Sequence, residues 1–220
     1  MKKRRINAVS RPVELVFHLI MFLFCLACII PFIFVIIILK VTNIQYEVYE
    51  YGSQVLSYLL TPSTVCLAIP LYQQMDLLKK NMKAILAGII SGVFTSLAGV
   101  WVFSMLFHLD KKIYATLLPK SITTAIGMGI SEELGGIVTI TVAVIIITGV
   151  LGNMIAEVVY KIAKIEEPIA RGLGLGTSAH AIGTAKAMEL GPVEGAMSSL
   201  AIAVAGLLTV IGASVFAGMM

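Results

Sequence analysis

Long apolar runs separated by short polar stretches make up most of the chain after residue 12. A helix needs about 20 consecutive apolar residues to cross a membrane, and the runs of about that length are 13–39, 84–107, 137–160 and 195–219. Because a backbone in lipid must satisfy its own hydrogen bonds, we expect these runs to be helices. The pattern therefore predicts an all-α, polytopic membrane protein.

Composition and charge support this prediction. The chain is 59% hydrophobic and 13% charged, which leaves too little polar surface to cover a soluble globule. The basic residues stand at the ends of apolar runs, so we attribute the net charge of +4 to membrane topology and expect no nucleic-acid partner. The run at 13–39 is far longer than the roughly 7–15 apolar residues of an export signal, and we interpret it as an uncleaved anchor.

Two shorter segments, 54–72 and 172–188, are apolar at their ends and polar in the middle. Pro62 in the first removes a helix donor, and glycines surround the centre of the second. The polar groups of the two centres are Thr61, Ser63 and Thr64 in the first and Thr177, Ser178 and His180 in the second. We predict two discontinuous membrane helices, within about six or seven transmembrane helices in all.

Residues 113–134 allow two interpretations. A full span at 113–130 would place the basic residues of 161–171 outside the cell, although basic residues tend to stay on the cytoplasmic side. A re-entrant hairpin would keep them inside, together with the lysines of 79–83. We prefer the hairpin, with the N-terminus in the cytoplasm.

The hairpin also gives the chain a symmetric organisation. Three crossings precede it and three follow in the opposite orientation, which is what an inverted repeat requires. We expect a basic cytoplasmic N-terminus at 1–12 and a single membrane domain at 13–220. Within that domain, repeat 1 covers 13–107, the linking hairpin 113–134 and repeat 2 135–220.

The sequence contains only weak matches to motifs that are typical of enzymes. Gly174, Gly176 and Ala179 resemble a dinucleotide fingerprint, but no strand precedes them. The chain contains no P-loop, and no buried carboxylate has an obvious place beside His180 for a catalytic triad. We expect no enzymatic activity, no catalytic residues, no cofactor and no metal site.

Interrupted helices in matching places of two halves are the best sequence pointer to the binding site of a transporter. An interrupted helix presents free N–H groups and a partial positive charge, so an anion can exchange its hydration for hydrogen bonds there. A carboxylate would suit such a site.

Several segments together resemble the LrgB/CidB family of bacterial membrane proteins, which shares a domain with the plastid glycolate/glycerate transporter. The resemblance rests on LLTPSTVCLAIPLYQQ at 59–74, LLPKSITTAI at 117–126, GGI at 135–137 and EPIARGLGLGTSAHAIGTAKAMELGPVEGAMSSLA at 167–201. Ala125 departs from the family's usual proline, Cys66 from alanine and Asn153 from a small residue. The N-terminal part also lacks an Asn-Pro pair that members have, which indicates that one helix of the first half is lost or fused.

The resemblance implies two alternative functions in the bacterial cell membrane. One is transport of small monocarboxylates of the pyruvate, lactate or glycolate class, either passive or coupled to an ion or proton gradient. The other is holin-like or antiholin-like modulation of murein hydrolase activity and autolysis, together with a small membrane partner of the LrgA/CidA type. Interrupted helices with polar centres favour transport, since a holin does not need them. A homo-oligomer is also expected.

For transport we predict a carboxylate site near the bilayer midplane. The predicted substrate-binding residues are Thr61, Ser63, Thr64, Lys120, Ser121, Thr123, Thr177, Ser178, His180 and Thr184, and the residues predicted to shape the site are Pro62, Pro119, Gly135, Gly136, Gly176 and Gly183. Two roles stay open. Lys120 either pairs with the substrate or extends to water at the interface, and His180 either couples transport to protons or donates a hydrogen bond to a neighbouring carbonyl.

Overall fold

The computed structural model describes residues 33–220, apart from the side chains of several residues in α2. All regular secondary structure of this part is helical. The predicted basic N-terminus at 1–12 and residues 13–32 of the predicted first span lie outside the described residues. The chain divides into two compact units, residues 1–62 and 63–220.

The described part of the first unit contains a helix at 33–41 and most of α2 (Tyr46–Cys66). The expected break at 61–64 is wrong in position, because α2 continues through Pro62 and ends at Cys66. The interruption lies at Leu67, before the short helix α3 (Ala68–Gln73), and the backbone of Leu67 is still close to helical, with φ −65° and ψ −17°. One proline removes one donor, and a membrane helix tolerates that loss when the neighbouring turns adjust.

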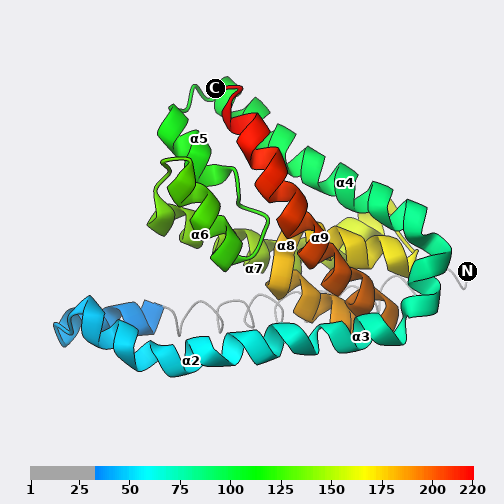
Figure 1. Ribbon diagram of the computed structural model, residues 1–220, viewed down its shortest axis with the longest axis horizontal. Helices are drawn as coiled ribbons and strands as arrows, with labels where there is room; N and C mark the ends of the chain where they lie inside the picture. Colours follow the sequence, from blue (N-terminus) through cyan, green and yellow to red (C-terminus); the bar gives the residue numbers. More distant parts are fainter. Residues whose placement is uncertain (1–32) are drawn as a thin grey trace, which may run out of the picture. The chain divides into compact units, whose positions relative to one another are not determined.

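Three long helices frame the second unit: α4 (Met75–Leu106), α7 (Val138–Ala163) and α9 (Pro192–Ala217). They are the described helices that are long and apolar enough to cross a membrane. α4 and α9 lie side by side over part of their lengths (Figure 1). The core between α4, α9 and α8 includes Ile85 and Ile89 of α4 and Met197 and Ala201 of α9. The prediction of an all-α membrane protein is confirmed.

The hairpin expected at 113–134 is present as α5 (Lys111–Leu117) and α6 (Thr124–Glu133). Both helices are too short to span a bilayer. A Cβ on Gly136 would lie 2.9 Å from Thr116 N, and one on Gly127 would lie 3.5 Å from Pro119 O, so the two helices run in opposite directions. We call residues 111–133 the first hairpin and residues 118–123 its tip.

Helix α8 (Pro168–Leu190) is a second hairpin. His180 has non-helical φ and ψ values of 42° and −133°, and the chain reverses there. A Cβ on Gly183 would lie 2.7 Å from Leu175 O and 2.6 Å from Ala179 Cβ, so residues 181–190 fold back on residues 168–179. We call these segments the second and the first leg of the second hairpin. The predicted interruption of 172–188 is therefore present, as a reversal rather than a local unwinding.

The two hairpins are related in sequence and in packing. Ala-Ile-Gly followed by Glu-Leu-Gly occurs at 125–135 and again, at the same spacing, at 181–191. In each copy, the glycine of Ala-Ile-Gly lies close to the backbone carbonyl of the residue eight positions earlier. Gly127 faces Pro119 O, and Gly183 faces Leu175 O. Each hairpin is then followed by a long helix. The predicted division into repeats at 13–107 and 135–220 stays a prediction, since it includes residues outside the described part.

The hairpins approach α7 from its opposite ends. Thr141 near the start of α7 donates a hydrogen bond to Thr116 O at the base of the first hairpin, at 2.9 Å. Tyr160 near the end of α7 donates to Arg171 O at the base of the second, at 2.7 Å. Between them, Ile145 is fully buried and contacts both hairpins, through Gly127 and through His180. The tips of the two hairpins therefore meet beside the middle of α7.

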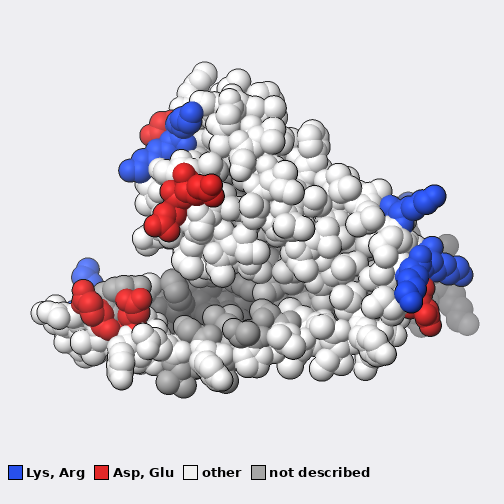
Figure 2. All heavy atoms as spheres, in the orientation of Figure 1, with Lys and Arg blue, Asp and Glu red and all other residues white. Residues whose placement is uncertain are grey.

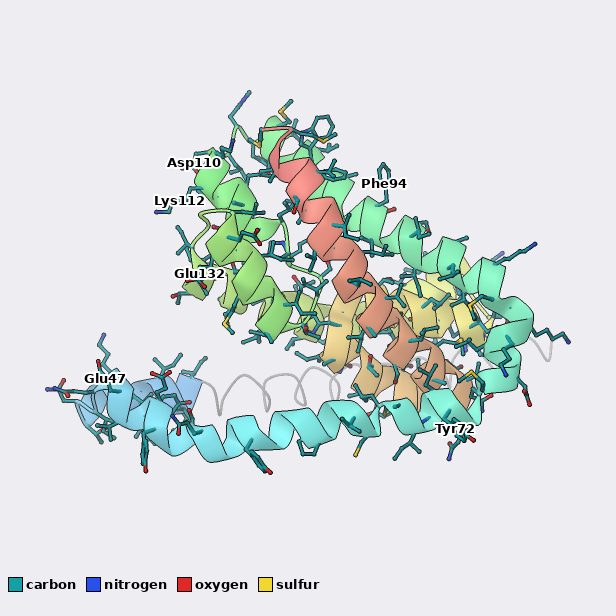
Figure 3. All side chains as sticks on the ribbon, viewed as in Figure 1. Glu47, Tyr72, Phe94, Asp110, Lys112 and Glu132 are labelled. Atoms are coloured by element: carbon teal, nitrogen blue, oxygen red, sulfur yellow. The ribbon has the colours of Figure 1, made fainter. Side chains whose placement is uncertain are left out.

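Charged side chains cluster at the ends of these elements. Asp110, Lys112 and Glu132 project from the base of the first hairpin (Figure 3), and on the face shown in Figure 2 wide uncharged areas separate the charged groups. The contacts of α8 with both helices bring the start of α4 and the end of α7 to the same end of the unit. Lysines 79–83 and the basic residues of 161–171 therefore share one end, as the hairpin interpretation requires.

Candidate functional site

A cavity of about 700 Å³ lies between α4, the tip of the first hairpin and the first leg of the second hairpin. We call it the central cavity. Its polar lining comes from Ser91, Thr95, Ser96 and Ser104 of α4, Lys120 and Ser121 of the first hairpin, and Thr177 and Ser178 of the second. The structure thus brings together four of the predicted binding residues: Lys120, Ser121, Thr177 and Ser178.

Lys120 is the one charged side chain among the described residues that line the central cavity. Its ammonium group donates a hydrogen bond to Ser121 Oγ at 2.9 Å, and Ser96 of α4 donates to the same oxygen at 2.9 Å. An ammonium group carries three protons, so Lys120 retains donors for a ligand. Since Ser121 Oγ accepts both bonds, its own proton is also free to be donated. An anion in the cavity would meet one positive charge and a hydroxyl donor beside it.

Thr177 and Ser178 contribute acceptor oxygens to the cavity. Thr177 is buried and donates its hydroxyl proton to Leu173 O at 2.8 Å, and Ser178 donates to Gly174 O at 2.6 Å. Their oxygens keep lone pairs that can accept from a hydroxyl group of a ligand or from a water molecule. The polar groups therefore suit a small molecule with an anionic end and further polar atoms.

Sequence reasoning missed the contribution of α4. Ser91, Gly92, Thr95, Ser96 and Gly99 line the central cavity, and their spacing of three and four residues places them on one face of the helix. This spacing of small and polar residues within an apolar span was the signal that could have revealed them. Glycine in a membrane helix more often serves helix packing, so Gly92 alone does not indicate a cavity.

Ser104 is a buried polar residue beside the central cavity. Its side chain is fully buried and lines the central cavity, yet its Oγ has no hydrogen-bond partner among the described residues. A buried hydroxyl without a partner costs about 1–3 kcal/mol.

Other predicted binding residues lie elsewhere. His180 is buried at the tip of the second hairpin, and its Nε2 donates to Ile145 O at 2.9 Å. Thr184 is buried against α9, where its hydroxyl is 2.7 Å from Ser198 Oγ and donates to His180 O at 3.0 Å. Thr123 precedes α6 without a side-chain capping bond. The side chains of Thr61, Ser63 and Thr64 lie outside what the structure describes.

Most residues predicted to shape the site are packed tightly. Pro119 is fully buried, and Gly176 faces Ser198 O at 2.6 Å from where its Cβ would be. Gly135 has a φ of 76°, which favours glycine, and it ends the first hairpin. Gly136 and Gly183 make the close contacts described above, and the role of all these residues in shaping a binding site stays a prediction. Pro62 is exposed within α2 and has no role that the structure identifies.

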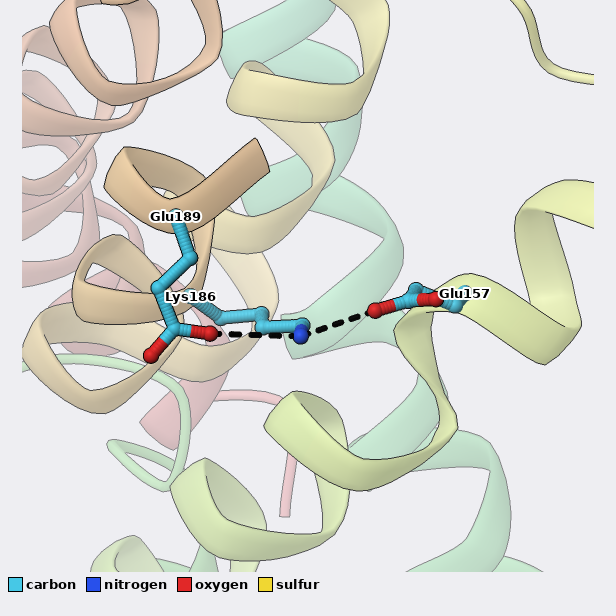
Figure 4. Close-up of polar contacts among 3 residues, drawn as sticks. All are labelled: Glu157, Lys186 and Glu189. Atoms are coloured by element: carbon cyan, nitrogen blue, oxygen red, sulfur yellow. Dashed lines mark hydrogen bonds and ion pairs between the residues drawn. The ribbon is translucent and has the colours of Figure 1, made fainter. Parts of the chain in front are cut away.

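A charged cluster that sequence reasoning missed links the second hairpin to α7. Lys186 on the second leg lies 2.8 Å from Glu157 of α7 and 3.3 Å from Glu189 (Figure 4). The Lys186 side chain is 9% exposed and that of Glu157 is 28% exposed. The lysine stands one turn before Glu189, but nothing in the sequence indicated that Glu157 would face it. Among residues 33–220 no group of side chains could hold a metal ion.

Comparisons with known proteins identify the family of the chain. A family model described as the LrgB-like family matches residues 13–219. The antiholin-like protein LrgB of Bacillus mycoides (strain KBAB4) is 40% identical over 176 residues, which cover 80% of this chain and 76% of that protein. The proteins of the same name from Bacillus cereus (strain B4264) and Bacillus anthracis (strain CDC 684 / NRRL 3495) have the same identity and coverage. No solved structure matches the chain. On the family match and these relatives, the chain belongs to the LrgB-like family.

Proposed function

We propose that the protein transports small monocarboxylates across the bacterial cell membrane through the central cavity. The observation that carries this proposal is Lys120, the single cation among the described residues that line the cavity, with free donors and a hydroxyl donor beside it on Ser121. A charged side chain in a membrane protein is costly unless it serves a ligand, a partner or a pathway. One positive charge matches one carboxylate.

The remaining lining fits a short organic acid. Val100, Phe103, Leu109 and Leu117 supply apolar surface, and the hydroxyls of α4 and the second hairpin supply hydrogen bonds. Ligand cavities of this kind combine an apolar wall with a few polar groups that fix orientation. Pyruvate, lactate and glycolate each have one carboxylate, few carbon atoms and one further oxygen.

A second candidate function is antiholin-like activity, and the names of the relatives favour it over transport. All of the relatives above are named antiholin-like protein LrgB. On this proposal the protein modulates murein hydrolase activity and autolysis, in a complex with a small membrane protein of the LrgA/CidA type. The two candidates are compatible if carboxylate flux changes the proton balance that controls lysis.

The orientation that we propose places the N-terminal end of α4 in the cytoplasm. Lys79, Lys80 and Lys83 stand at that end of α4, and basic residues of 161–171 share it, whereas the base of the first hairpin carries Lys111 and Lys112. Basic residues concentrate on the cytoplasmic side of membrane proteins. The proposal also includes assembly of several copies of the chain.

Uptake in proteoliposomes tests both candidates. The purified protein is reconstituted with a neutral dye inside the vesicles, and entry of radiolabelled pyruvate, lactate and glycolate is followed with and without a proton gradient. Saturable uptake with the dye retained supports transport. Dye release without saturation supports the holin-like function and contradicts transport. A parallel sample with the small membrane partner shows whether either activity needs it.

A further inference from the structure

A second cavity lies next to the central cavity, and the close contact between Thr177 and Gly92 lies where the two meet. The second cavity has a volume of about 460 Å³, extends along α4 from Gly92 to Asn81 and ends beside Glu167, at the start of α8. We call it the N-end cavity. The central cavity extends from the same Gly92 to Ser104 and Leu109, toward the other end of α4. Both cavities share Gly92, Gly174 and Thr177 in their lining.

The barrier between the two cavities is the contact of Thr177 with Gly92. A Cβ on Gly92 would lie 2.8 Å from Thr177 Oγ1 and 3.0 Å from Thr177 Cβ, so no atom larger than hydrogen fits between them. One turn away, a Cβ on Gly88 would lie 3.0 Å from the end of the Leu173 side chain. The first leg of the second hairpin therefore presses against α4 along two glycines.

The position of this contact suits a barrier across the membrane. α4 has 32 residues and hence a length of about 48 Å, and Gly92 stands near its middle. The hairpin leg that carries Thr177 ends at the reversal at His180 and packs closely on α9, where a Cβ on Gly176 would lie 2.6 Å from Ser198 O. A short movement of α4 relative to this leg would join the two cavities.

We infer that Thr177 and Gly92 form the gate of a pathway along α4, which separates a ligand in the central cavity from the N-end cavity. This inference rests on the proposed transport function and adds the place at which the pathway closes. Glycine at 92 lets the threonine approach the backbone of α4, and the contact opens when α4 moves relative to the first leg of the second hairpin.

Cysteine labelling tests the gate without requiring transport. In the full chain with its three cysteines replaced by alanine, Gly99→Cys places a thiol in the central cavity and Ala84→Cys places one in the N-end cavity. A Cβ on Gly99 meets nothing within 4 Å, so a thiol fits there. A membrane-impermeant maleimide is added to one face or the other of membrane vesicles. We expect each variant to label at least about tenfold faster from one face, and the two variants to prefer opposite faces. Labelling of both variants from the same face, or from both faces at equal rates, overturns the gate.

A disulfide tests whether the contact must open. Gly88→Cys combined with Leu173→Cys places two thiols across the same approach of the first leg to α4, one turn from the gate, where a Cβ on Gly88 would lie 3.0 Å from the end of the Leu173 side chain. Neither residue lines the central cavity, so the reduced protein should keep its uptake. Oxidation should lower carboxylate uptake at least about tenfold, and reduction should restore it, whereas each single variant should not respond to oxidation. Undiminished uptake after complete cross-linking overturns the gate. If the cysteine-free protein shows no uptake but the labelling preference for opposite faces holds, the gate stands and the proposed transport of carboxylates falls.

Discussion

Lys186 Nζ on the second leg of the second hairpin lies 2.8 Å from Glu157 Oε1 on α7. The two residues are the main charged link between the hairpin and this long helix, and Glu189 adds a more exposed contact to the same ammonium group at 3.3 Å. Removing one partner of a largely buried ion pair leaves the other charge without compensation. The pair therefore fixes the position of the second leg against α7. Thr177 belongs to the other leg of the same hairpin.

Replacement of Lys186 should weaken the fold. We expect Lys186→Met to lower the stability of the protein in detergent by about 2 kcal/mol, since Glu157 then stays partly buried without its partner. Thermal unfolding of the purified protein measures the change. The double variant Lys186→Met with Glu157→Gln should recover most of the loss, because no charge is left unpaired. Equal loss in the single and the double variant would show that the lysine acts through packing instead.

Lys120→Met should raise the substrate concentration that half-saturates uptake while the protein stays folded. The variant removes the one cation among the described lining residues of the central cavity, and a charged hydrogen bond contributes about 1.5–3 kcal/mol. The apparent affinity for a carboxylate should therefore fall roughly ten- to a hundredfold. Lys120→Arg keeps the charge and serves as the matched control. Unchanged half-saturation in Lys120→Met would remove this residue from the binding site.

Thr177→Val should abolish uptake. Valine has nearly the shape of threonine, so the contact with Gly92 is kept, but the hydroxyl oxygen that faces the cavity is lost. The hydroxyl donates to Leu173 O within the helix, so its loss costs little stability. Binding of the ligand and unfolding temperature are measured side by side. Uptake equal to that of the parent protein would contradict a role of this hydroxyl in the site.

The fold class, the family, the first hairpin and an interruption within 172–188 could be predicted from the sequence, because lipid allows few structures and leaves a strong pattern of apolar runs. The reversal of the chain at His180 was not predicted. The break at 61–64 was predicted wrongly, since the effect of Pro62 depends on whether neighbouring turns adjust. The hydrogen bond of His180 to Ile145 and the ion pair of Lys186 with Glu157 depend on how α7 packs against the second hairpin. Such contacts between distant segments have no signal in a single sequence.

His180 offers a test that separates its two predicted roles. The imidazole donates to Ile145 O, and the residue has a φ of 42°, a region where asparagine is enriched. We expect His180→Asn to keep most of the uptake, because the amide N–H can donate in place of the ring. His180→Ala should lose uptake. If His180→Asn also loses uptake, or loses only its dependence on a proton gradient, the ring acts in proton coupling.

Gly183 tests whether the second hairpin needs its tight reversal. A Cβ at this position would lie 2.6 Å from Ala179 Cβ and 2.7 Å from Leu175 O, and the carbonyl belongs to a helix backbone that cannot move aside. Gly183→Ala should therefore separate the two legs and lower stability by about 1–3 kcal/mol, as overpacking does. The matched control is Gly129→Ala in α6, where a Cβ meets nothing within 4 Å, so the substitution should raise stability by about 0.5–1 kcal/mol. Thermal unfolding in detergent measures both variants. If both substitutions have the same effect, the two legs of α8 are not held together by the contact at Gly183, and residues 168–190 do not form the close hairpin on which the gate depends.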